Sequence, residues 1–168
     1  MAMLMVGPPD PAGFTRRTVA DLAAYVKVLR PGLSDYRALR LARITDHWAN
    51  RYGVDAALMV TLIRQETYFD SVEACWPAPW LGRNARTCDR GLAQINDVWV
   101  QKWHLDRKRL LEDDWYNIWI QARVLSWTRL HYGDEPDWWG RYHSATPWRK
   151  AQYVAKIRSF LALMPPRR

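Results

Sequence analysis

The sequence predicts a mainly α-helical fold, and three observations support this class. Apolar residues recur at intervals of three and four through most of the 168-residue chain. Helix-capping residues and Pro or Gly stops lie at the ends of these periodic stretches, and no long alternating strand pattern is present. Hydrophobic residues make up 49% of the chain and charged residues 25%, which suits one folded domain with a single core.

The N-terminal part is predicted to be an arm followed by a short helix. Residues 1–13 are rich in Pro and should form a flexible arm. A helix is expected over residues 18–29, with Thr18 as a cap and Pro31-Gly32 as the stop. We divide the chain into an N-terminal arm and helix (1–32), a main domain (33–164) and a tail (165–168). The sequence leaves open whether the first helix belongs to the core or docks elsewhere.

Two longer helices should follow. One is expected to start at Ser34 and end at Gly53, with apolar residues at helical spacing. The next starts at Asp55, a favourable N-cap, and continues to about Tyr68. Its apolar stripe consists of Leu58, Met59, Leu62 and Ile63.

The remainder of the chain is predicted as a loop and four further helices. A loop follows that contains Pro77, Pro79, Gly82 and the two cysteines. A short helix capped by Asn96 or Asp97 follows, then a long helix over residues 113–132. A short helix opens at Pro136, and the last begins at Thr146-Pro147, where Pro occupies the first helical position, and ends before Pro165-Pro166.

The net charge of +8 favours an anionic partner such as nucleic acid, anionic lipid or a polyanionic cell wall. No basic tail or helix face of base-contacting residues is present, so we do not expect a nucleic-acid partner. The densest basic cluster, between residues 102 and 109, is expected to form a solvated turn. The 11 Trp against 3 Phe weakly favour a flat ligand such as a sugar ring.

No stretch is long and apolar enough to span a membrane. Residues 1–6 are apolar, but they lack the basic start and the full apolar segment of a signal peptide. We therefore expect either another export route or a signal that was removed before this numbering begins.

Two cysteines, Cys75 and Cys88, could form a disulfide in an oxidising compartment, or they could remain free thiols. A disulfide there would stabilise the fold by roughly 3 kcal/mol. The four His residues show no metal-ligand spacing, so neither a metal site nor a cofactor is expected.

Glu66 is the candidate catalytic residue. It follows Leu62 by four positions and Ile63 by three, so it continues the apolar stripe of its helix. Apolar surroundings raise the pKa of a carboxyl group, and a carboxyl that keeps its proton near neutral pH can act as a general acid. The alternative is a structural Glu that reaches solvent at the helix end or pairs with Arg64.

Four segments, in the right order, resemble motifs of lytic transglycosylases. Residues 63–70, with Glu66, Thr67 and Phe69, resemble the family's glutamate motif, and residues 88–95 resemble its Gly-Leu-Met-Gln-Ile segment with Ala93 in place of Met. Asn117-Ile118 resembles an Asn-Ile pair of the family, and residues 141–144 occupy the place of its Ala-Tyr-Asn segment. The similarity covers about residues 33–157 and is greatest to members associated with secretion or conjugation machines.

The resemblance implies a lysozyme-like helical domain of the goose-type or SLT class with an active-site cleft. Glu66 would protonate the β-1,4 bond between N-acetylmuramic acid and N-acetylglucosamine of peptidoglycan. It would then take the proton of the muramoyl 6-hydroxyl, giving a 1,6-anhydro product without a metal or cofactor. The substrate-binding residues implied are Thr67, Gly91, Leu92, Gln94, Tyr142 and His143. Among these, Tyr142 would hydrogen-bond Glu66 or the substrate, and Gly91 would let sugar approach the backbone.

The expected partner is the peptidoglycan glycan strand, and the expected location is the periplasm or the cell wall. A secretion or conjugation machine is a further candidate partner. Two alternatives remain. Asp89, two residues before Gly91, could position a water and make the protein a hydrolytic lysozyme. The chain could also be a peptidoglycan-binding module without catalysis, which the His143 departure from the family's Asn favours.

Overall fold

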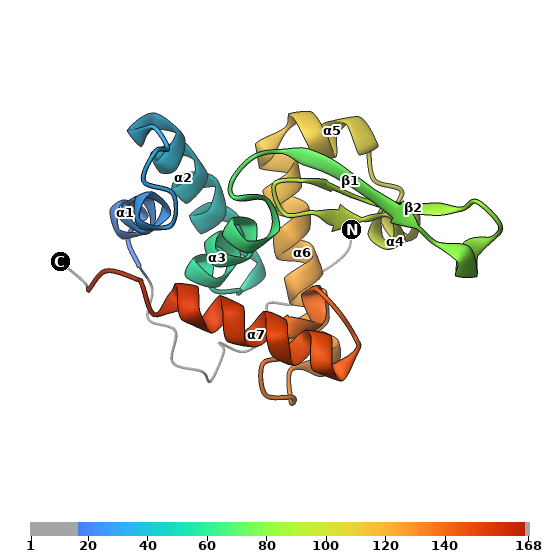
Figure 1. The fold of residues 1–168 in the computed structure, drawn as a ribbon. Coiled ribbons are helices and arrows are strands. Elements are labelled where there is room, and N and C mark those ends of the chain that lie inside the picture. Colours follow the sequence, from blue (N-terminus) through green and yellow to red (C-terminus); the bar gives the residue numbers. More distant parts are fainter. Residues whose placement is uncertain (1–16, 167–168) are drawn as a thin grey trace.

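The computed structural model describes residues 17–166, so the predicted arm and the last two residues of the tail lie outside the described part. The described chain forms seven α-helices and one small three-stranded sheet (Figure 1). Helix accounts for 64% of the structure, which confirms the mainly α class.

The first three helices begin at the predicted capping residues. Helix α1 (Val19–Leu29) is capped by Thr18, α2 (Asp35–Tyr52) by Ser34 and α3 (Ala56–Thr67) by Asp55. In each case a side-chain oxygen accepts a bond from a backbone N–H of the first turn, which otherwise lacks a partner. Helix α2 ends at Gly53, whose φ of 63° lies in the left-handed region that favours glycine.

Helix α1 is part of the main core. Its side chains Leu22, Tyr25 and Val26 are fully buried, and they join the same apolar cluster as α2 and α3. The Tyr25 hydroxyl lies 2.8 Å from the hydroxyl of Thr61 on α3, inside this core. The sequence leaves open whether the first helix belongs to the core or docks elsewhere, and the structure shows that residues 19–29 belong to the core.

Helix α3 is buried on all sides along residues 57–63, rather than along one stripe. It lies in the middle of the fold, with α1 and α2 against it and α7 (Pro147–Leu161) passing across it (Figure 1). A helix enclosed in this way gives a polar residue at its end a low-dielectric environment.

The predicted loop between α3 and the next helix is wrong in part, because it is mostly a β-hairpin. Strands β1 (Val72–Pro77) and β2 (Arg86–Gly91) pair antiparallel, and the short β3 (Ile95–Asn96) pairs with β2. A single turn, η1 (Pro79–Leu81), lies at the tip. Strand β1 is mostly exposed and β2 is partly buried, and neither alternates apolar with polar residues in the way that would have indicated a strand.

Four more helices and a second short turn complete the fold. They are α4 (Asp97–Trp103), α5 (Arg107–Glu112), α6 (Asp114–Tyr132), η2 (Trp138–Tyr142) and α7. The expected solvated turn around residues 107–109 is wrong, since these residues open α5 behind the Asp106 cap. No helix of the described chain has both the length and the hydropathy needed to cross a membrane.

Candidate functional site

Glu66 lies in the last turn of α3 and is partly buried. Its Oε1 accepts a hydrogen bond from the Tyr153 hydroxyl at 2.5 Å. Tyr153 belongs to α7 and is itself 5% exposed, so the contact joins two helices that are far apart in sequence. The alternative ion pair with Arg64 is absent: the Arg64 Nε donates to the Leu29 carbonyl, and its guanidinium lies over the Tyr68 ring.

The surroundings of Glu66 raise its pKa to about 7, and burial is the main cause. The negative charge of Asp89 raises it further, whereas the hydrogen bond from Tyr153 lowers it by favouring the carboxylate. A carboxyl group with this pKa holds its proton in a large fraction of molecules near neutrality. It can therefore give a proton to a leaving group and later accept one.

Tyr142 does not hydrogen-bond Glu66, which corrects one form of the sequence prediction. Its hydroxyl donates to the Ala93 carbonyl at 2.6 Å. Burial and the charge of Glu66 raise the pKa of both Tyr142 and Tyr153 well above the usual value. Both phenols therefore remain O–H donors over the whole range in which Glu66 titrates.

Tyr153 is the residue whose role the sequence analysis missed. A signal existed, because Tyr153, Val154 and Ile157 form a buried helical stripe, and a buried Tyr hydroxyl needs a partner. His143 stacks on the Tyr153 ring, with centroids 4.5 Å apart and planes 3° from parallel. Burial and nearby Arg149 lower the pKa of His143, so it is a neutral stacking ring near pH 7. We find His143 positioned to hold Tyr153 in place.

The turn at residues 91–94 is fastened by side chains from three helical elements. Thr67 of α3 donates to the Leu92 carbonyl at 2.8 Å, and Tyr142 of η2 donates to Ala93. Asn117 of α6 accepts from the Ala93 N–H at 2.9 Å and donates to the Arg90 and Leu110 carbonyls. Asn117 is 1% exposed, and its amide joins this turn to the end of β2 and to α5. The turn is therefore a rigid wall beside the end of α3.

Gly91 is required by packing rather than by an open approach for a ligand. Its φ is 77°, and an added Cβ would lie 2.0 Å from the Leu110 carbonyl oxygen and 2.1 Å from the Asn117 Nδ2. Leu92 has a fully buried side chain. The Gln94 Nε2 donates to the Val72 and Gly91 carbonyls, which ties the turn to β1. A glycan contact by Gln94 or its neighbours stays a prediction.

Asp89 of β2 is the second carboxyl group beside Glu66. Its Oδ1 accepts a bond from the Asn96 Nδ2 at 2.5 Å. The pKa of Asp89 is raised, and burial is the largest cause. The negative charge of Asp97 also raises this pKa, whereas the hydrogen bond from Asn96 and the positive charge of Arg90 lower it. The Asp89 charge raises the pKa of Glu66, and two neighbouring carboxyl groups whose surroundings differ serve as acid and base in many enzyme sites.

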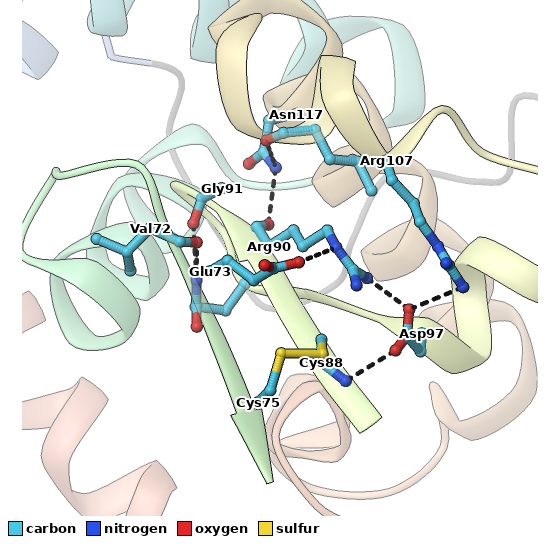
Figure 2. Close-up of polar contacts among 11 residues, drawn as sticks. Val72, Glu73, Cys75, Cys88, Arg90, Gly91, Asp97, Arg107 and Asn117 are labelled. Carbon is cyan, nitrogen blue, oxygen red and sulfur yellow. Dashed lines mark hydrogen bonds and ion pairs between the residues drawn. A yellow bond between two sulfur atoms is a disulfide. The ribbon is translucent and has the colours of Figure 1, made fainter. Parts of the chain in front are cut away.

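An ion-pair network lies at the base of the hairpin (Figure 2). Arg90 is 5% exposed and donates to Glu73 at 2.6 Å and to Asp97 at 2.5 Å. The other oxygen of Asp97 accepts from the Cys88 N–H at 2.8 Å, and Arg107 lies 3.7 Å from Asp97. The network joins the base of the hairpin to α4 and α5.

Cys75 and Cys88 face each other across β1 and β2 and are joined by a disulfide. Together with Glu73 they are the group of metal-ligand residue types found among residues 17–166. Metal binding needs free thiolates, and both sulfur atoms are used by the disulfide. We therefore conclude that Glu73, Cys75 and Cys88 stabilise the hairpin, through the disulfide and the ion pair with Arg90.

A separate pocket of about 430 Å³ lies between η2 and α7, lined by apolar residues and by Arg141, Lys150 and Arg158. Glu66 is not among its lining residues, and Glu135 or Asp137 pairs with each of the three cations.

No known protein family, curated protein or solved structure matches this chain. The function must therefore be argued from the site itself.

Proposed function

We propose that the protein is a lytic transglycosylase of lysozyme-like fold that cleaves the glycan strands of peptidoglycan. The observation that carries the proposal is the partly buried Glu66 carboxyl at the end of α3, which has a pKa of about 7 and a phenol as its partner. A cation in that place would favour the carboxylate and remove the proton that a general acid must donate. The motif resemblance supplies the substrate class.

In the proposed reaction, Glu66 acts first as an acid and then as a base. The protonated carboxyl gives its proton to the glycosidic oxygen of the leaving N-acetylglucosamine as the bond to muramic acid C1 breaks. The Glu66 carboxylate then accepts the proton of the muramoyl 6-hydroxyl, whose oxygen bonds to C1 and closes the 1,6-anhydro ring. No water is consumed, and Glu66 returns to its starting state. Tyr153 holds the carboxyl in one orientation during both steps.

The test is digestion of purified cell-wall sacculi followed by mass analysis of the products. The wild-type protein should release anhydro-muropeptides, and Glu66→Gln should lower the rate at least about a hundredfold, the usual scale of general acid catalysis. Glu112→Gln is the matched control, because Glu112 is an exposed carboxylate on α5. This variant should cleave sacculi at the wild-type rate. Sacculi that bind the protein but yield no products would instead favour a binding module.

Hydrolysis is the second candidate, and the position of Asp89 favours it. A carboxylate whose charge acts on Glu66 from the adjacent strand could activate a water or stabilise a cationic sugar. The products decide, because a lysozyme leaves reducing ends that contain one added water. Asp89→Asn should then abolish hydrolysis, whereas a transglycosylase should retain most of its activity in the same variant.

The periplasm or the cell wall is part of this proposal, because the substrate is found there. A secretion or conjugation machine as partner rests on the resemblance alone.

A further inference from the structure

The end of the β-hairpin exposes several large apolar side chains. We call residues 76–86 the hairpin tip. Trp80 is 74% exposed, Leu81 60% and Trp76 47%, and the neighbouring prolines are exposed as well. In Figure 1, β1 and β2 extend to one side of the helices, so that this tip projects from the body of the molecule. Apolar area on a projecting segment is unfavourable in water and is typical of a surface that contacts a partner.

The hairpin tip is held in one conformation. The Cys75–Cys88 disulfide crosslinks the strands directly beneath it, and the Arg86 guanidinium donates to the Cys75 carbonyl at 3.0 Å. The Ala78 N–H donates to the Ala85 carbonyl at 2.7 Å, which closes the tip. Trp80 and Leu81 are thus presented outward by a rigid support, and their exposure before binding reduces the ordering cost of an interaction.

The charge of this segment has one sign. Residues 74–88 contain Arg83 and Arg86 and no acidic residue. Both arginines are exposed and flank the apolar end. The whole chain carries a net charge of +8, so its long-range attraction also favours an anionic surface.

We propose that the hairpin tip docks on an anionic lipid surface. Trp80 and Leu81 insert at the level of the headgroups, where Trp is favoured, and Arg83 and Arg86 pair with lipid phosphates. The projecting apolar end suits a lipid surface better than a glycan strand, because sugar hydroxyls need polar partners around the stacking ring. Leu81, Pro77 and Pro79 offer no side-chain donor or acceptor. The inference does not depend on Glu66.

The test is co-sedimentation of the full, disulfide-bonded chain with vesicles. Vesicles of phosphatidylglycerol and phosphatidylcholine should bind the protein, and binding should weaken as salt is raised. The double variant W80S/L81S should lower the partition coefficient at least about tenfold, because it removes the inserting apolar groups. Arg83→Glu should lower it about tenfold as well, since it reverses one charge at the surface.

Trp148→Ser provides the matched control. Trp148 is 58% exposed and belongs to α7 rather than to the hairpin, so its loss should leave vesicle binding unchanged. Glu66→Gln should also bind vesicles like the wild type, which separates this inference from the proposed reaction. Circular dichroism and the melting temperature should show that each variant is folded.

Two outcomes would overturn the inference. One is equal vesicle binding by the wild type and W80S/L81S. The other is loss of binding to insoluble sacculi in W80S/L81S without any change on vesicles, which would identify the hairpin tip as a glycan-binding platform.

Discussion

Glu66 and Asp97 are two carboxyl groups near the turn at residues 91–94, since Thr67 beside Glu66 bonds the Leu92 carbonyl and Asp97 follows the turn by three residues, yet their surroundings differ. Asp97 is 8% exposed and lies against the guanidinium of Arg90, with the Cys88 N–H on its other oxygen. Glu66 has a phenol in place of a cation. Burying a charge is costly unless an opposite charge or a proton offsets it. The charge of Asp97 is balanced by Arg90, and this pair holds the hairpin. Glu66 avoids the cost by keeping its proton, which leaves it available for acid–base chemistry.

The largest effect is expected when Arg90 loses its charge. Arg90→Met leaves Asp97 in a buried site with only the more distant Arg107, and the free energy of unfolding should fall by about 3 kcal/mol or more. Urea denaturation at pH 7 measures this loss. The double variant R90M/D97N should recover much of the stability, because no unbalanced carboxylate remains. A loss below about 1 kcal/mol in R90M would contradict the role assigned to this pair.

Glu66→Gln should stabilise the protein at alkaline pH. The folded-state pKa of Glu66 is about 7 against an ordinary value of 4.5, so the folded protein binds more protons than the unfolded chain in this window. Wild-type stability should therefore fall as pH rises from about 4.5 through about 7, by up to about 3 kcal/mol, and stay lower above it. The glutamine cannot ionise and should not show this slope.

Unfolding by urea at pH 4 and pH 8 checks this prediction. The two proteins should be alike at pH 4, and E66Q should be the more stable at pH 8. Glu112→Gln, on an exposed residue, should match the wild type at both values. Equal stability of E66Q and wild type at pH 8 would show that Glu66 is not held in an environment that opposes its charge.

Tyr153 and Asp89 should move the pH profile in opposite directions. If Glu66 must be protonated, kcat/KM falls as pH rises through its pKa. The Tyr153 bond lowers that pKa and the Asp89 charge raises it. Tyr153→Phe should therefore move the alkaline fall of kcat/KM, the alkaline limb of the pH profile, to higher pH. Asp89→Asn should move the alkaline limb to lower pH, measured on the activity that this variant retains. Each shift should be of the order of half a unit to one unit.

Tyr142→Phe discriminates between the two phenols. It removes a donor to the Ala93 carbonyl, so it should lower stability and leave the alkaline limb in place. A limb that moves in Y142F but not in Y153F would reverse the assignment of the Glu66 partner.

The smallest effect is expected at Thr67, which joins α3 to the turn at residues 91–94. Thr67→Val removes the bond to the Leu92 carbonyl and should lower the free energy of unfolding by about 1 kcal/mol. Thr67→Ser retains the hydroxyl and should lose less. Urea denaturation of both variants gives the comparison, and equal losses would show that the methyl group matters more than the bond.

The helical elements could largely be predicted because their signals are local. Thr18, Ser34 and Asp55 each cap a helix through contacts within three residues, and Gly53 stops α2 through its own backbone preference. The hairpin could not be predicted in this way. Its two strands show no apolar alternation, and they are held by a disulfide and the Arg90 network, which join residues that no periodicity relates.

The sequence by itself determined the mainly helical class, most helix starts and the placement of Glu66 among apolar residues, because each depends on neighbours within one or two turns. Only the tertiary structure decided that Tyr153 rather than Tyr142 bonds Glu66, that Asn117 and Leu110 rather than a ligand require Gly91, and that Asp89 lies close enough to influence the acid. These contacts join α3, β2, α6 and α7 across long stretches of chain. Their distances follow from packing, which a one-dimensional pattern does not contain.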